Sequence, residues 1–203
     1  MGLPGHALKL RLTFEAFDIH NFVETGTRKG RTVARIAQLS RKFFDNRIKI
    51  QSIEINGKFY EYSAKRFAAN PDITIHYGAS KNIIGPLASS LDSKPTFWWL
   101  DAHFGSIDPF PLKDELSSIL KNRDTSKDII LIDDLRIYDD GTVKYSPAAR
   151  WKGGKRNEVG GGVKFLREMF PESIIIESPA SNGMGIIFPP KVKDQVFIQG
   201  LVR

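Results

Sequence analysis

The sequence contains no cysteine, and this absence excludes several kinds of chemistry. Disulfide frameworks, zinc–thiolate sites, iron–sulfur clusters and cysteine nucleophiles all need thiol groups. No window approaches the roughly 18 uninterrupted apolar residues that a membrane-spanning helix needs, so we expect no membrane insertion. The opening residues, MGLPGHALKLRLTFE, also lack the basic-then-apolar order of a signal peptide. We therefore expect a cytoplasmic protein.

The chain has a net charge of +7, yet it lacks an arginine-rich tract and any signature of an RNA-binding module. A positive charge of this size permits an acidic partner such as nucleic acid. Because basic residues occur along the whole chain, we interpret the charge as a solvated, mildly basic surface and do not expect a nucleic-acid partner. The sequence does not indicate an oligomeric state.

Apolar segments of strand length alternate with segments of helical periodicity through the first two thirds of the chain. Strands are expected at 20–25, 47–54, 73–78, 96–101 and 128–134, and helices at 28–44, 56–69, 80–91 and 111–123. Gly85 and Pro86 are expected to interrupt the third of these helices. Strands joined by helices pair in parallel through right-handed crossovers. The pattern predicts a Rossmann-like, doubly wound α/β sheet.

The last third of the chain departs from this alternation. Residues 139–162 are polar and glycine-rich and are expected to form a long loop, followed by a helix at 163–170. Strands at 173–178 and 183–189 lie only a few residues apart, which favours an antiparallel hairpin. We expect one domain over 1–203 with a mostly parallel sheet of seven strands. The start at Met1 would also fit a domain taken from a longer enzyme.

The segment FVETGTRKGRT, residues 22–32, joins the first strand to the first helix of this pattern. Three residues separate Gly26 from Gly30, which fits neither the Walker phosphate loop nor the G-x-G-x-x-G fingerprint. Glu24, at the strand end, argues against a bound phosphate. Glu54 ends the second strand, where an acid commonly binds ribose hydroxyls. The two acids predict a pocket for a neutral-to-cationic nucleoside, although the glycines could merely shape a turn and Glu54 could cap a helix.

Five segments in order resemble the class I S-adenosylmethionine-dependent methyltransferases, and the resemblance covers nearly the whole chain. They are VETGTRKGRT, SIEI, YGAS, WWLDAHF and LIDDL, and the terminal hairpin matches as well. The resemblance implies S-adenosylmethionine as cofactor, with its amino-acid end at Glu24 and Gly26, its ribose at Glu54 and its adenine near Ala79 or Ser80. The expected cofactor contacts are Glu24, Thr25, Gly26, Thr27, Gly30, Thr32, Glu54, Ile55, Gly78, Ala79, Ser80 and Asp101.

Asp101 ends the fourth strand, and Asp133 and Asp134 end the fifth. If these strands are neighbours, as the resemblance implies, the three carboxylates converge, and hard oxygen ligands favour Mg²⁺ or another divalent cation. A bound cation would ease deprotonation of a hydroxyl, with His103 or Asp101 as general base. The arrangement is similar to that of metal-dependent sugar O-methyltransferases, but His103 follows Asp101 at two residues rather than three. A structural His103, and a metal-free site with Asp101 as base, stay open.

Arg136, Tyr138 and Trp151 are expected to bind the methyl acceptor, with 139–162 as a loop or lid hinged by the glycines at 160–162. The leading interpretation is an O-methyltransferase that acts on a carbohydrate hydroxyl of a small molecule or glycan, such as a deoxyhexose. An RNA methyltransferase and a catalytically silent binding module are the alternatives.

Overall fold

The computed structural model describes residues 5–102, 111–135, 164–178 and 184–190. The helices are α1 (Gly5–Ala16), α2 (Arg31–Phe43), α3 (Gly57–Phe67), α4 (Ser80–Ser90), α5 (Leu112–Asn122) and α6 (Lys164–Met169). The strands are β1 (Asn21–Thr25), β2 (Lys49–Glu54), β3 (Ile73–Tyr77), β4 (Thr96–Leu100), β5 (Ile129–Asp133), β6 (Ile174–Ser178) and β7 (Met184–Phe188).

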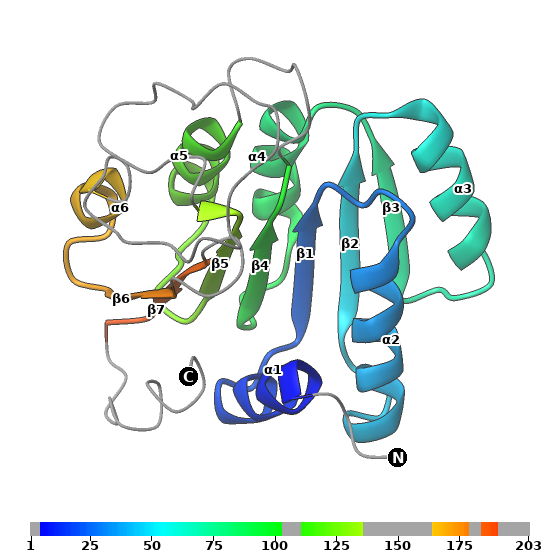
Figure 1. Cartoon of the computed structure of the whole chain (residues 1–203), viewed down its shortest axis with the longest axis horizontal. Coiled ribbons are helices and arrows are strands. Elements are labelled where there is room, and N and C mark those ends of the chain that lie inside the picture. Colours follow the sequence, from blue (N-terminus) through cyan, green and yellow to red (C-terminus); the bar gives the residue numbers. More distant parts are fainter. Residues whose placement is uncertain (1–4, 103–110, 136–163, 179–183, 191–203) are drawn as a thin grey trace.

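The strands form one seven-stranded sheet in the order β3-β2-β1-β4-β5-β7-β6 (Figure 1). The first five pair in parallel, whereas β7 pairs antiparallel with both β5 and β6. The predicted fold class, including the antiparallel hairpin, is therefore confirmed. The single domain over 1–203 stays a prediction.

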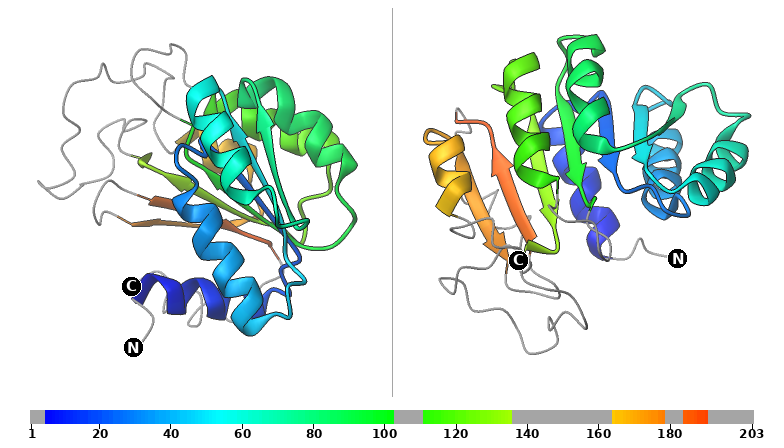
Figure 2. Two further views of the ribbon diagram at one scale, coloured as in Figure 1. Left: turned by 90° about the vertical axis from the view of Figure 1, so that its right-hand side faces the viewer. Right: turned by 90° about the horizontal axis from the view of Figure 1, so that it is seen from above.

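Apolar side chains cover both faces of the sheet, because neighbouring strand residues point to opposite sides. Phe14 of α1 and Ile36 of α2 are fully buried on one face, beside Phe22 of β1. Ile84 of α4 and Leu116 of α5 are fully buried on the other. Figure 2 shows α4 and α5 on the opposite side of the sheet from α1 and α2. The strand ends are consequently held in a fixed arrangement.

Three helix assignments differ from the expectation. The sequence analysis assigned no element to α1, whose leucines alternate with polar residues in a way that does not indicate a helix. Helix α2 begins at Arg31 rather than at 28, because Arg28 and Gly30 have left-handed backbone angles (φ 53° and 65°) that a right-handed helix cannot include. Helix α4 runs unbroken through Gly85 and Pro86, and Gly85 lets it pack closely against Asn122 of α5.

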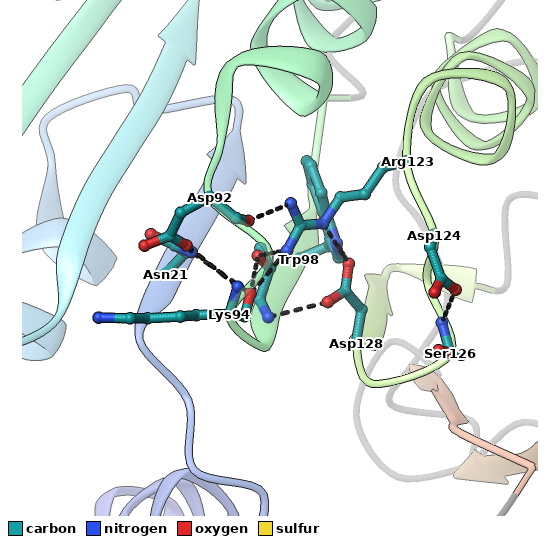
Figure 3. A network of polar contacts seen from close by, with 9 residues as sticks. Asn21, Asp92, Lys94, Trp98, Arg123, Asp124, Ser126 and Asp128 are labelled. Carbon is teal, nitrogen blue, oxygen red and sulfur yellow. Dashed lines mark hydrogen bonds and ion pairs between the residues drawn. The ribbon is translucent and has the colours of Figure 1, made fainter.

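A buried ion pair joins the starts of β4 and β5 to the end of α5 (Figure 3). Asp128 accepts hydrogen bonds from the indole Nε1 of Trp98 and the guanidinium Nε of Arg123, at 2.9 and 2.8 Å. The Arg123 and Asp128 side chains are only 7% and 1% exposed. This network lies at the opposite end of the parallel strands from the predicted site and fixes Trp98 in the core.

None of the helices in the described ranges combines the length and apolar character needed to cross a bilayer. The cytoplasmic location stays a prediction from the sequence.

Candidate cofactor site

The turn after β1 is held tightly between its two neighbouring strands. The Gly26 amide donates to the carbonyl oxygen of Ile53 at 2.9 Å, and the Asp101 amide donates to the carbonyl oxygen of Thr25 at 3.2 Å. Gly26 has φ 88°, and a Cβ at this position would lie 2.6 Å from the carbonyl oxygen of Asp101. Only glycine fits both the backbone angle and the gap. The close approach at Gly26 is thus one of main chain to main chain.

Glu24 lies beneath this turn and is 2% exposed. Its Oε2 accepts a hydrogen bond of 2.6 Å from the Ser52 hydroxyl, which in turn shares one of 2.6 Å with the hydroxyl of Thr27. The Thr32 hydroxyl also bonds to Glu24. Burial raises the pKa of Glu24 to about 8, against the lowering effect of these hydroxyls, and the negative charges of Asp101 and Glu54 raise it further.

Glu54, at the end of β2, ties the turn to the start of α3. Its Oε2 accepts from the backbone amide of Arg28 at 2.6 Å, and its Oε1 accepts from that of Asn56 at 2.7 Å. The helix-capping side chain is Asn56, which accepts from the amides of Lys58 and Phe59. Glu54 therefore does not cap α3 itself. Each of its oxygens has one protein donor, and a carboxylate oxygen can accept a second bond.

The charges at these strand ends suit a cationic ligand. Glu24, Glu54 and Asp101 come from the ends of β1, β2 and β4, and they lie close enough for two of them to raise the pKa of the third. A positive charge placed among them would relieve this repulsion, whereas a phosphate would add to it. The chemistry of the residues thus fits the sulfonium and ammonium groups of S-adenosylmethionine.

The remaining predicted cofactor contacts lie around the same edge of the sheet. Thr25 and Thr27 are buried, and Ile55 is 47% exposed directly after Glu54. Gly78 follows β3 and donates its amide to the carbonyl oxygen of Glu54 at 2.9 Å, with Ala79 and Ser80 at the start of α4. Packing also explains the glycine at position 30, because a Cβ there would lie 2.5 Å from the Phe67 ring.

The predicted metal ligands sit at the ends of neighbouring strands. Leu100 of β4 pairs with Ile132 of β5, so Asp101 and Asp133, the next residue of each chain segment, lie side by side. Asp134 has φ 52° and donates its amide to Oδ1 of Asp133 at 2.8 Å. No group of three or more His, Cys, Asp or Glu side chains in the described ranges is arranged to hold a metal ion. The predicted residues His103, Arg136, Tyr138 and Trp151, and the loop 139–162, lie outside the described residues.

Ser52 is the residue of the site that the sequence analysis missed. It lies in β2, is fully buried, and bridges Glu24 to Thr27. The signal was present in KIQSIE, where Ile50, Ser52 and Glu54 share one face of the strand, so that a hydroxyl lies on the same face as the predicted acid.

No protein-family model matches the chain, and no curated protein is significantly similar to it in sequence. Solved structures are similar in fold. The O-methyltransferase TomG of Streptomyces achromogenes, involved in tomaymycin synthesis and bound to S-adenosylmethionine, aligns with a TM-score of 0.62 and 15% identity over 93% of this chain and 81% of its own. An O-methyltransferase of Bacillus cereus with bound S-adenosylhomocysteine aligns with a TM-score of 0.61 and 14% identity, over 93% of this chain and 82% of its own. The Podospora anserina methyltransferase PaMTH1 with bound S-adenosylhomocysteine aligns with a TM-score of 0.59 and 15% identity, over 93% of this chain and 79% of its own. The chain therefore has the fold of the class I S-adenosylmethionine-dependent O-methyltransferases.

Proposed function

We propose that the protein is an S-adenosylmethionine-dependent O-methyltransferase. The observation that supports this most is the set of three acids, Glu24, Glu54 and Asp101, around the left-handed turn at Gly26. It occurs at the edge of the sheet where ligands of open α/β folds bind. The fold of the three methyltransferases above agrees with this assignment.

The acids would divide the recognition of the cofactor between them. Glu54, whose two oxygens are oriented by backbone amides, would accept from the ribose hydroxyls. Glu24 is bonded to Ser52 beneath the turn, so its charge would act on the amino-acid end through the turn rather than by direct contact. Ile55, exposed beside Glu54, offers an apolar surface to the adenine.

Methyl transfer would take place between the ends of β4 and β5. S-adenosylmethionine, when bound, supplies a methyl group on a positively charged sulfur. The acceptor hydroxyl would lie beside Asp101 and give its proton to that carboxylate, or to His103, as its oxygen forms the new bond to the methyl carbon. The electron pair of the broken carbon–sulfur bond stays on sulfur. Asp101 is well placed as the base because its amide is fixed by the backbone and side-chain oxygens of Thr25.

A carbohydrate hydroxyl, of a small molecule or a glycan, is the acceptor we propose, with Arg136, Tyr138 and Trp151 as its contacts. The carboxylates at the ends of β4 and β5 favour a polyhydroxylated acceptor, because each can accept bonds from neighbouring hydroxyls. Assistance by Mg²⁺ at Asp101, Asp133 and Asp134 also belongs to the proposal. Because no set of described side chains is arranged to hold a metal ion, the transfer step above is written with a protein base alone.

The proposal is tested by transfer of a labelled methyl group from S-adenosylmethionine to a panel of sugars and oligosaccharides. Asp101→Asn should lower the rate at saturating cofactor at least about 100-fold, which is within the range of a lost general base. A catalytically silent module would bind the cofactor without transferring its methyl group to any acceptor. An unchanged rate in Asp101→Asn would contradict the assigned base.

A further inference from the structure

One continuous segment carries a large excess of positive charge. Residues 28–66 contain 11 Lys and Arg but only 3 Asp and Glu, a net charge of +8. The whole chain has 30 basic and 23 acidic residues, so the residues outside this segment comprise 19 basic and 20 acidic ones, a net charge of −1. Basic residues do occur along the whole chain, as the sequence analysis stated. Residues 141–167 also carry an excess, with 7 Lys and Arg against 1 Glu, but the excess in residues 28–66 is larger.

All 11 of these basic side chains are exposed, and we call them the basic face. They are Arg28, Lys29, Arg31, Arg35, Arg41, Lys42, Arg47, Lys49, Lys58, Lys65 and Arg66. On α2, Arg31, Arg35 and Lys42 recur at helical spacing on the side opposite the buried residues Val33 and Ile36. Helices α2 and α3 cover the same face of the sheet, since Phe67 packs against the same cluster as Val33.

Hydrogen bonds join the two helices into one surface. The Arg66 guanidinium of α3 donates to the carbonyl oxygens of Lys29 and Gly30, at 2.5 and 3.3 Å. The Ser63 hydroxyl donates to the carbonyl oxygen of Arg28 at 2.8 Å. The end of α3 therefore meets the start of α2, and both helices lie at the right of Figure 1. The positive charge forms a continuous band rather than two separate patches.

Few acidic side chains in the described ranges pair with the basic face. Arg47 pairs with Asp18 at 2.9 Å, and Lys49 pairs with Asp72. For Lys58 and Lys65, no acidic side chain lies within ion-pair distance in the part of the chain that the structure describes. A partner rich in negative charge would complement this band.

An exposed aromatic side chain interrupts the lysines of α3. Tyr62 is 54% exposed and lies four residues after Lys58 and three before Lys65, so the three share one side of the helix. Basic residues interleaved with exposed aromatics are typical of surfaces that bind single-stranded nucleic acid, where cations contact phosphates and rings stack on bases. A membrane surface would require exposed apolar side chains along a helix, but the apolar sides of α2 and α3 face the sheet.

We propose that the basic face binds single-stranded nucleic acid, with Lys58 and Lys65 on its phosphates and an unpaired base stacked on Tyr62. Helices α2 and α3, which carry most of the band, pack against β2 and β3, away from the acceptor side at β4 and β5, so the nucleic acid need not be the methyl acceptor. The proposal does not rest on methyl transfer and stands even if the proposed activity fails.

The test is fluorescence anisotropy with a labelled single-stranded RNA of mixed sequence, about 16 nucleotides long, which is the upper site size of a single-strand-binding fold. We expect the logarithm of the dissociation constant to rise with the logarithm of salt concentration with a slope of about 3, as for roughly four released counterions. Lys58→Glu with Lys65→Glu should weaken binding at least about tenfold. The matched control is Lys113→Glu with Lys121→Glu, two exposed lysines of α5 that change the net charge equally and should alter affinity less than about threefold.

Tyr62→Ala tests the single-strand assignment, because loss of base stacking should weaken binding about 5- to 100-fold without removing charge. Equal losses in the two lysine pairs, no measurable binding, or unchanged affinity in Tyr62→Ala would overturn the proposal. Stronger binding to vesicles of anionic phospholipid or to a sulfated glycan than to the RNA would overturn it as well.

Discussion

The Ser52 hydroxyl donates a hydrogen bond of 2.6 Å to the buried carboxyl group of Glu24. This contact joins the second strand to the first directly beneath the turn that begins at Gly26. Although Ser52 and Thr32 favour the ionised form, burial dominates and raises the pKa of Glu24 to about 8. In the protein without ligand, Glu24 is therefore mostly protonated at neutral pH, and a cation bound above it would favour loss of that proton.

The first prediction concerns stability and pH. A carboxyl group with a raised pKa in the folded state stabilises the fold fully below the unfolded pKa, near 4.5, and this stability is lost as the pH rises to about 8. The unfolding free energy should therefore fall by roughly 3–5 kcal/mol more in the unmodified protein than in Glu24→Gln between these limits. Urea unfolding at pH 5 and pH 8 measures the difference, and parallel pH profiles of the two proteins would contradict it.

The second prediction concerns the turn. Gly26→Ala should destabilise the protein by about 2–4 kcal/mol, because alanine disfavours a positive φ and its Cβ would overlap the carbonyl oxygen of Asp101. Gly57→Ala is the matched control. Its Cβ would meet no atom closer than the Tyr77 hydroxyl at 3.5 Å, and alanine is the better helix former. Thermal unfolding should separate the two variants clearly, and equal midpoints would show that the turn is not constrained as described.

The third prediction concerns the ion pair at the opposite strand ends. Arg123→Leu should lower the free energy of unfolding by about 3–5 kcal/mol, because it leaves the carboxylate of Asp128 buried without its charged partner. Arg167→Leu removes an ion pair whose arginine is 61% exposed, and it should cost less than about 1 kcal/mol. Chemical denaturation of both variants gives the comparison. Similar losses of unfolding free energy in the two variants would mean that burial of Asp128 does not make its ion pair more important for stability.

Most of the fold could be predicted from the sequence, because alternation of strand and helix periods leaves few topologies. The apolar run IILI and the spacing of Val33, Ile36 and Leu39 were enough to locate β5 and α2. Helix α1 could not be recognised, since its leucines alternate and its stability comes from tertiary burial of Phe14 against Phe22 and Phe97.

The site was predicted in outline rather than in geometry. Acids at strand ends are visible in the sequence, so Glu24, Glu54 and Asp101 could be brought together in advance. The exposure of these side chains could not be predicted, because it depends on how the turn folds over them. Glu24 was expected to line the nucleoside pocket, and the structure buries it under Gly26 with Ser52.

The fourth prediction concerns the metal. If Asp101, Asp133 and Asp134 hold a divalent cation in the working enzyme, treatment with EDTA should lower methyl transfer at least about tenfold, and added Mg²⁺ should restore it, because the cation eases loss of the hydroxyl proton. The binding of S-adenosylmethionine should be unaffected by the chelator. A rate that does not respond to EDTA would refute the metal proposal and leave the methyltransferase proposal intact.

Calorimetric titration with S-adenosylmethionine tests the central claim most directly. The account predicts saturable one-to-one binding, weakened at least about tenfold in Glu54→Gln through loss of a charged hydrogen-bond acceptor. The control Glu61→Gln, at an exposed position of α3, should bind like the unmodified protein. An absence of binding heat at millimolar cofactor, or equal affinity in Glu54→Gln and the unmodified protein, would contradict the account.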